Sequence, residues 1–274
     1  MRKTDSDANH TMTQRGFSLV ELSIVLVILG LLVGGVLSGQ SLIRAAELRS
    51  ISAEYSRYFT ATQSFRDKYI ALPGDMNNAT QFWGRQNSNA DCVTNSASAV
   101  TANGSCDGNG NGNVFEAAGA SLSGEQFQLW RQLQLAGLVE GTYTGYAGSA
   151  GAAHAVIGTN APRSRITNVG WSIAYDDCSG NAERYAVCMG NNYVLGRAST
   201  TGHPTLAFLT PEEAWNIDTK LDDGKPAQGK VIARFWNNAC AAADDGSSAV
   251  NDLVASYRLS DRTNQCSLHF REVF

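Results

Sequence analysis

An apolar run near the start of the chain constrains the fold more than any other stretch. It covers residues 17–37, and Glu21 is the single charged residue within it. A helix of this length rises about 30 Å, roughly the thickness of the hydrocarbon core of a bilayer. A carboxylate in hydrocarbon is costly unless another group pairs with it. We therefore expect residues 17–37 to form one transmembrane helix whose Glu21 needs a partner.

The residues that precede the run distinguish it from an ordinary secretory signal. Such a signal has its small-residue cleavage site after the apolar region, whereas here Gly16 follows Arg15 and comes before it. The sequence Arg-Gly-Phe-Ser-Leu-Val-Glu, followed by a long apolar helix, resembles the N-terminus of type IV prepilins and of the pseudopilins of type II secretion. The resemblance is confined to this N-terminal part of the chain.

The resemblance implies a processing route and a set of partners. A prepilin peptidase would cleave between Gly16 and Phe17, the new amine of Phe17 would be methylated, and the helix would remain as membrane anchor and assembly core. Glu21 would then meet the N-terminal amine of a neighbouring subunit, which neutralises two costly buried charges at once. The implied partners are other pilin or pseudopilin subunits, an inner-membrane platform protein, an assembly ATPase and membrane lipid. The alternative is a plain single-span anchor with Glu21 at the headgroup level.

The charges before the run predict its orientation. Residues 1–16 form a polar leader in which Arg2, Lys3 and Arg15 outnumber Asp5 and Asp7. Positive charge before a first span favours a cytoplasmic N-terminus and an exported remainder, so we expect a single-pass inner-membrane protein with a periplasmic head. The formal net charge of −4 comes without a basic stripe, so nucleic acid is not expected as the main ligand.

The helical periodicity continues beyond the apolar run in a more polar sequence. Large apolar residues recur three, four or seven positions apart, namely Leu48, Ile51, Tyr55, Tyr58, Phe65 and Tyr69. We expect one helix from residue 17 to about residue 69, with residues 38–71 as an amphipathic continuation that packs on a globular domain. Pro73 ends it, because proline disfavours helical geometry at Leu72. Glycines in the first half either permit close helix contact or local unwinding, or are simply common in membrane helices: Gly30, Gly34, Gly35 and Gly39.

Residues 72–274 are long enough to bury their own core and predict an exported globular head, so the fold class is α+β. Capping signals predict one helix that opens at Ser123 and another that opens at Thr210, with Pro211 at its first position. Short segments rich in β-branched and aromatic residues predict an antiparallel sheet: residues 155–157, 170–175, 184–189, 230–236, 253–259 and 267–273. Residues 72–84 and 209–231 resemble parts of the heads of large pilin-like proteins.

A glycine-rich loop over residues 106–113 offers a candidate cation site. Oxygen-bearing side chains alternate with glycines there, and calcium loops use the same alternation. The expected Ca²⁺ ligands are Asp107, Asn109, Asn111 and Glu116. The match to the helix–loop–helix pattern is incomplete, because Ala118 stands where a bidentate glutamate is expected. The alternative is a glycine–asparagine turn without metal.

Six cysteines in the exported part predict disulfides, because that compartment is oxidising. Sequence alone permits any pairing, and the local one joins Cys92 to Cys106, Cys178 to Cys188 and Cys240 to Cys266. Zinc is a weak alternative, since no Cys-x-x-Cys pair occurs.

Little in the sequence indicates catalysis. His154, His203 and His269 are scattered, and neither a zinc-helix motif, a nucleophile elbow nor a phosphate loop is present. Asp218, Asp222 and Asp223 form either an acidic patch for a cation or partner or, as we expect, a solvated helix face.

These observations predict a structural subunit that is not an enzyme. The expected function is a pilin or pseudopilin of a type IV filament or a type II secretion system, processed by prepilin peptidase and assembled through its N-terminal helix. The alternative is a membrane-anchored adhesin or binding protein that never polymerises, because an apolar span needs only to anchor.

Overall fold

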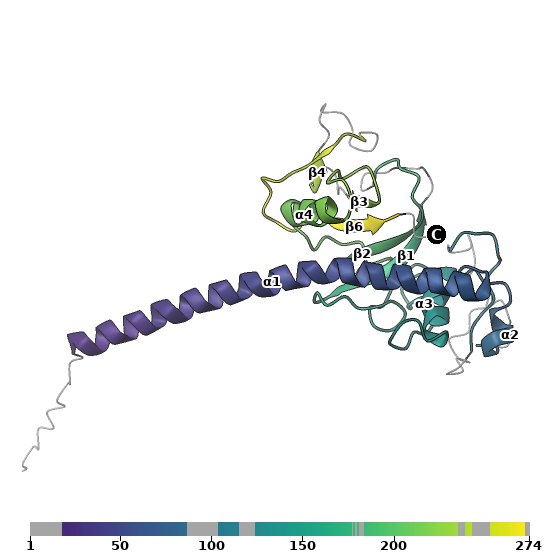
Figure 1. Cartoon of the computed structure of the whole chain (residues 1–274), viewed down its shortest axis with the longest axis horizontal. Coiled ribbons are helices and arrows are strands. Elements are labelled where there is room, and N and C mark those ends of the chain that lie inside the picture. Colours follow the sequence, from purple (N-terminus) through teal and green to yellow (C-terminus); the bar gives the residue numbers. More distant parts are fainter. Residues whose placement is uncertain are drawn as a thin grey trace, which may run out of the picture. The chain divides into compact units, whose positions relative to one another are not determined.

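The structure, a computed structural model, contains one very long helix and a globular part with an antiparallel sheet, so the fold is α+β as predicted (Figure 1). It describes residues 18–86, 104–114, 124–176, 178, 180, 184–234, 239–242 and 253–271. The chain divides into two compact units, Met1–Ala46 and Glu47–Phe274. The second is called the globular unit below.

Helix α1 extends over Leu19–Tyr69, and its end agrees with the helix expected from the periodicity. Within the globular unit, one stripe of α1 is buried, comprising Ser50, Ile51, Glu54, Tyr58, Ala61, Thr62 and Phe65. The helix ends in a left-handed residue, Ile70, with φ of 53°. Pro73 follows three residues later, which keeps the chain from continuing as a helix.

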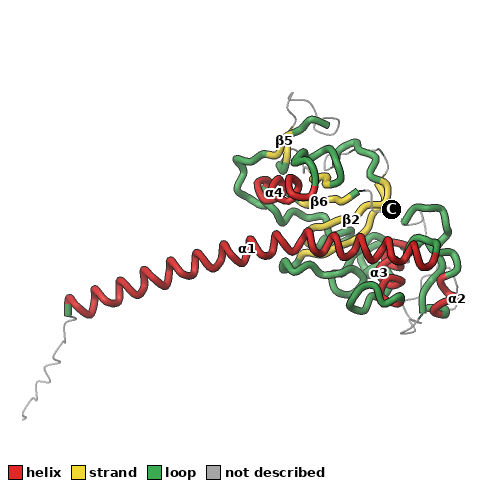
Figure 2. The backbone as a smooth tube through the Cα atoms, viewed as in Figure 1, coloured by secondary structure: helices red, strands yellow, loops and turns green. Residues whose placement is uncertain are grey.

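The main sheet has four strands in the order β1-β2-β6-β3, and every neighbouring pair is antiparallel. Figure 2 draws the strands in yellow. The strands are β1 Val169–Asp176, β2 Gly190–Arg197, β3 Val231–Arg234 and β6 Ser267–Phe270. A second pair joins β4 Ala241–Ala242 to β5 Ser256–Tyr257. Helix α4, Pro211–Leu221, packs beside β3 and β5.

Three of the six predicted strand segments are confirmed as β1, β3 and β6, and residues 253–259 contain only the short β5. The predicted strands at residues 155–157 and 184–189 were wrong, because neither segment forms a regular strand. Sequence reasoning missed β2, which starts with Gly190-Asn191-Asn192, a turn-like beginning. Since β2 is a central strand buried on both faces, it lacks the alternation that marks a half-buried strand.

One face of the sheet forms the core with α1 and with α3, Glu125–Leu135. Its centre is aromatic: the Tyr58 ring lies 5.1 Å from that of Trp130 and 5.6 Å from that of Trp171, in edge-on geometry. Tyr193 and Phe270 complete the cluster. Edge-on aromatic pairs add about 0.5–1.5 kcal/mol each beyond the area they bury.

A buried carboxylate fixes α1 to this sheet. Glu54 is 6 % exposed, and its Oε2 accepts the indole N–H of Trp171 at 2.7 Å. Its Oε1 accepts the backbone N–H of Arg165 at 2.9 Å and the hydroxyl of Ser50 at 3.2 Å. The hydrogen bonds therefore specify the register between the helix and β1.

Helix α3 holds the surrounding loops through buried amide and guanidinium side chains. Gln132 accepts the backbone N–H of Gly74 and donates to the carbonyl of Cys106. Arg131 donates to the carbonyls of Gly104 and Tyr143. The predicted cap of this helix was wrong, because its N-cap is Gly124 and no side chain caps it.

Helix α4 begins as predicted, with a capping box. The Thr210 hydroxyl accepts the backbone N–H of Glu213, whose carboxylate accepts that of Thr210, and Pro211 opens the helix. Disulfides join Cys178 to Cys188 and Cys240 to Cys266, as the local pairing predicts. Cys92 lies outside the described residues, so its pairing with Cys106 stays a prediction.

Candidate functional site

The strongest candidate site is the apolar beginning of α1. Every residue from 18 to 38 is exposed, including large side chains such as Leu19 at 86 % and Leu31 at 73 %. Among the described residues, α1 is the one helix long and apolar enough to cross a membrane. Its glycines at positions 30, 34, 35 and 39 have no atom near the place of a side chain. Such a surface is stable in lipid or against other helices, not in water.

Glu21 lies in the first turn of α1, where its carboxylate has one hydrogen-bond donor among residues 18–86 and the other described ranges. The backbone N–H of Ser18 donates to Glu21 Oε2 at 2.9 Å, and the Ser18 hydroxyl accepts the N–H of Val20 at 3.3 Å. This arrangement resembles a capping box, in which a Ser and a Glu three positions later satisfy the open N–H groups of a helix start. Sequence reasoning missed this local role, although the spacing Ser-x-x-Glu signals it.

Glu21 is also the single charge between residues 18 and 43. One N–H donor leaves the carboxylate with most of its lone pairs open to a further donor or a cation. The predicted cleavage site, Gly16 and Phe17, lies outside the described residues.

Comparison with protein families bears on this same segment. The model of the prokaryotic N-terminal methylation motif matches residues 11–37. The chain therefore carries the prepilin-type signal of type IV pilins and pseudopilins, which implies processing by a prepilin peptidase and assembly with other pilin subunits. The motif marks structural proteins of the pilin-like class, which are not enzymes, and together with the apolar helix it fits a membrane-anchored protein. Neither the curated proteins nor the solved structures gave a match to the chain.

The predicted calcium loop is partly described, and Glu116 lies outside the described residues. Both carboxylate oxygens of Asp107 bind Thr80, at 2.7 Å to its backbone N–H and 2.9 Å to its hydroxyl. They thus stabilise the first turn of α2, Ala79–Trp83. Asn109 Oδ1 accepts the N–H of Asn111 at 2.9 Å, so these oxygens bind donors of the protein itself. Calcium binding stays a prediction, which calorimetry with calcium at millimolar concentration tests.

The backbone of this loop surrounds a different carboxylate, that of Asp75. Asp75 Oδ1 accepts the N–H of Gly110 at 2.7 Å and that of Asn111 at 3.1 Å, and Oδ2 accepts the N–H of Gly112 at 2.8 Å. Successive N–H groups aimed at one point form an anion-binding concavity. The segment 72–84 and the glycine-rich loop are therefore two halves of one structure, a relation that sequence reasoning did not find.

The acidic residues at the C-terminal end of α4 differ from the solvated face that the sequence predicts. Asp218 is fully buried and accepts hydrogen bonds from the Tyr257 hydroxyl at 2.8 Å and the Gly224 N–H at 3.2 Å. Asp222 accepts the backbone N–H groups of Lys230 and Val231, and Asp223 is exposed. Burial raises the pKa of Asp218 to about 7, and the neighbouring carboxylates add to the rise. The prediction was therefore wrong for Asp218, because a residue of β5 covers it.

The sheet face opposite the aromatic core carries polar groups. His269 Nδ1 lies 2.8 Å from Asn192 Oδ1 and 3.8 Å from the Asp176 carboxylate, which also pairs with Arg184. His203 Nδ1 lies 3.0 Å from the Ser172 hydroxyl. Burial lowers the pKa of His203 to about 4 and that of His269 well below its usual range, with nearby Arg234 and Arg184 acting in the same direction. Both rings are therefore neutral at pH 7.

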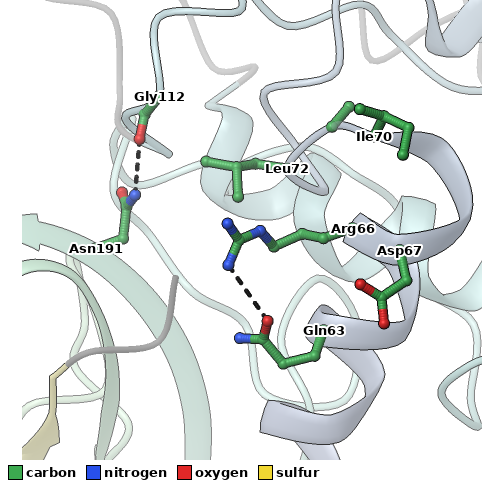
Figure 3. Close-up of a pocket in the computed structure, with 8 residues that line it drawn as sticks. Gln63, Arg66, Asp67, Ile70, Leu72, Gly112 and Asn191 are labelled. Carbon is green, nitrogen blue, oxygen red and sulfur yellow. Dashed lines mark hydrogen bonds between the residues drawn. The ribbon is translucent and has the colours of Figure 1, made fainter.

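A surface pocket of about 670 Å³ lies where α1 ends (Figure 3). The Arg66 guanidinium points toward Gln63 and donates to its side-chain oxygen at 3.3 Å. Across the pocket, Asn191 donates to the carbonyl of Gly112 at 2.8 Å. The lining also includes Asp67, Ile70, Ala71 and Leu72. No nucleophile and base face one another here, so the pocket offers no catalytic arrangement among the described residues.

Proposed function

We propose that this protein is a filament subunit, a pilin or pseudopilin that is cleaved before Phe17, held in the inner membrane and assembled through the first half of α1. The prepilin-type motif supports the precursor class. The observation that carries the assembly role is the fully exposed apolar segment with one carboxylate in its first turn. Exposed side chains of this kind need lipid before assembly and neighbouring helices afterwards.

The chemistry of Glu21 supports the same proposal. Its carboxylate has one hydrogen-bond donor among the described residues, and full neutralisation in an apolar surrounding needs a cation. Cleavage before Phe17 creates such a cation, the N-terminal amine, at the end of each neighbouring helix. Pairing across subunits then removes two uncompensated charges and fixes the axial stagger of the filament.

Two experiments test the proposal. Mass analysis of the native protein should show a chain that begins at Phe17 and carries a methyl group on its amine. Glu21→Ala should abolish filaments while membrane insertion persists, because the apolar length is unchanged. The matched control is Ser23→Ala, since the Ser23 hydroxyl donates to the Val20 carbonyl of its own helix, and we expect this variant to assemble normally.

A retained leader or normal filaments from the Glu21→Ala variant would overturn the proposal. In that case a membrane-anchored binding protein that never polymerises is the better account of the span. Whether the filament belongs to a pilus or to a type II secretion system is tested by deleting the gene and scoring surface fibres against protein export. For both systems we propose a single-pass inner-membrane protein with a periplasmic head before assembly, and a filament in the periplasm or at the cell surface afterwards.

A further inference from the structure

The glycine-rich loop contains two sites of potential chemical modification. Asn109-Gly110 and Asn111-Gly112 are Asn-Gly steps, the dipeptide whose asparagine deamidates most readily. The glycine nitrogen loses its proton and attacks the asparagine side-chain carbonyl carbon, ammonia leaves, and a cyclic imide forms. Water then opens the imide to aspartate or isoaspartate. The net change is an amide and a water converted to a carboxylic acid and ammonia, without any oxidant or reductant.

The loop conformation requires both dipeptides. Gly110 and Gly112 have φ of 71° and 85°, in the left-handed region where a side chain is strained. The asparagines are equally specified, because Asn109 Oδ1 accepts the N–H of Asn111 and Asn111 Oδ1 accepts the N–H of Asn113 at 2.8 Å. A substitution that removes either Asn-Gly step would therefore disrupt one of the turns of this loop.

Asp75 holds the two nitrogens that would act as nucleophiles. The Gly110 N–H donates to Oδ1 at 2.7 Å and also to the backbone carbonyl of Asp75 at 3.1 Å, and the Gly112 N–H donates to Oδ2 at 2.8 Å, so one carboxylate binds both nitrogens. Asp75 is 5 % exposed, and hydrogen bonds to a buried charge are strong. Each bond must break before its nitrogen can turn toward the neighbouring asparagine side chain.

We propose that Asp75 protects Asn109 and Asn111 from deamidation, and that these two asparagines become modification sites when the hydrogen bonds of Asp75 with Gly110 and Gly112 are broken. The reaction would reinforce itself. A new carboxylate at position 109 would lie close to that of Asp75, because the Asn109 Oδ1 and Asp75 Oδ1 accept the same N–H of Asn111. An isoaspartate at either position lengthens the backbone of a loop fitted around Asp75. The first event thus weakens the bonds that delay the second.

The test compares the full chain in detergent with its Asp75→Asn variant during long incubation at pH 8 in a chelating buffer. Peptide mapping would follow the conversion of each amide to an acid and the appearance of isoaspartate. We expect Asp75→Asn to deamidate at Asn109 and Asn111 at least about tenfold faster, since the loss of a hydrogen bond to a charge changes an opening equilibrium by that order. The Asn103-Gly104 step in the same digest is the internal comparator, and its rate should change much less.

Two controls separate local release from general unfolding. Tyr257→Phe destabilises the globular unit elsewhere by removing the hydrogen bond to Asp218, and it should leave both rates near those of the unaltered protein. Asp67→Asn removes an exposed carboxylate of the same unit and should do the same. Unchanged rates in Asp75→Asn would overturn the proposal. Slower rates would also overturn it, because the carboxylate would then be a base that takes the glycine proton.

Discussion

Two of the three glutamates of helix α1, Glu21 and Glu54, lie in opposite surroundings. Glu54 is 6 % exposed, and three donors from its own chain, the Trp171 indole, the Arg165 N–H and the Ser50 hydroxyl, satisfy its carboxylate. Glu21 lies on an exposed apolar surface and, within the part of the chain that the structure describes, receives one donor, the Ser18 N–H. The described fold thus satisfies the first carboxylate more fully than the second.

The difference teaches how to tell a structural charge from an assembly charge. A carboxylate that the fold satisfies contributes to stability, and its removal leaves buried donors without partners. A carboxylate that the fold leaves incomplete contributes little to stability, and its remaining capacity points to a second molecule. By this criterion Glu54 belongs to the packing of the globular unit, and Glu21 belongs to the proposed contact between subunits.

The largest stability effect is expected from Glu54→Ala. The substitution leaves the Trp171 indole N–H and the Arg165 backbone N–H without the acceptor they have now. Each unsatisfied buried donor costs about 1–3 kcal/mol, so the free energy of unfolding should fall by about 2–6 kcal/mol. Thermal or denaturant unfolding followed by tryptophan fluorescence measures it. Asp67→Ala, an exposed position on the same helix, should change stability by less than about 0.5 kcal/mol.

If Glu54→Ala and Asp67→Ala lowered the free energy of unfolding equally, burial and hydrogen bonding would not distinguish a structural carboxylate from an exposed one. Glu21→Ala belongs to the same series. We expect it to leave the unfolding of the globular unit unchanged.

Asp218 is a third carboxylate, between these extremes, and its effect depends on pH. Burial raises its pKa in the folded state to about 7 from the ordinary 3.8. Between about pH 4 and pH 7 the folded protein keeps a proton on Asp218 that the unfolded chain releases, so the contribution of Asp218 to stability falls as the pH rises. The buried His203 and His269, whose pKa values are lowered, contribute in the opposite direction. Asp218→Asn should remove only the Asp218 contribution, so its stability relative to the unaltered protein should grow with pH and reach a gain of roughly 1–3 kcal/mol at pH 8.

Unfolding at a series of pH values checks that prediction, with the exposed Asp223→Asn as control. If the stability difference between Asp218→Asn and the unaltered protein did not grow between pH 4 and pH 8, the proton would have to be assigned to another group.

A smaller effect is expected where α1 meets β2. Thr62 Oγ1 lies 2.6 Å from the Tyr193 hydroxyl, which also donates to the Tyr58 carbonyl at 3.1 Å. Thr62→Val keeps the shape and removes one bond, so we expect a loss of about 1 kcal/mol in unfolding free energy. Chemical denaturation measures it, and a loss as large as that of Glu54→Ala would show that the two bonds to Tyr193 act as one unit.

The features that local sequence predicts are those with local causes. The end of α1, the Thr210 capping box and strands β1, β3 and β6 follow from periodicity, a hydrogen bond across three residues, or a run of β-branched and aromatic side chains. Each is settled within about one element. Glu21 was found for the same reason, because a single charge in an apolar run is visible without any partner.

The features that sequence reasoning missed depend on partners far along the chain. Glu54 and Trp171 are 117 positions apart, and Asp75 lies 35 positions from Gly110. Asp218 reads as a solvated helix residue until Tyr257, 39 positions later, covers it. Composition and spacing do not indicate which distant donor a carboxylate contacts. Sequence reasoning therefore could not distinguish the satisfied carboxylates of Glu54, Asp75 and Asp218 from the less satisfied one of Glu21.

The smallest effect is expected at the point where the buried half of α1 ends. Ile70 is 87 % exposed and has φ of 53°, a left-handed conformation that costs a β-branched residue about 1–2 kcal/mol. Ile70→Gly removes that strain from the folded state. Glycine also raises the conformational entropy of the unfolded chain, which offsets part of the effect, so we expect a net stabilisation of up to about 1 kcal/mol. The matched control is Asn168→Gly, at φ of 60° and also exposed, where a smaller gain is expected because asparagine tolerates this conformation. Denaturant unfolding of both variants tests this prediction. A less stable Ile70→Gly would mean that packing of the Ile70 side chain at the edge of the pocket outweighs the backbone strain.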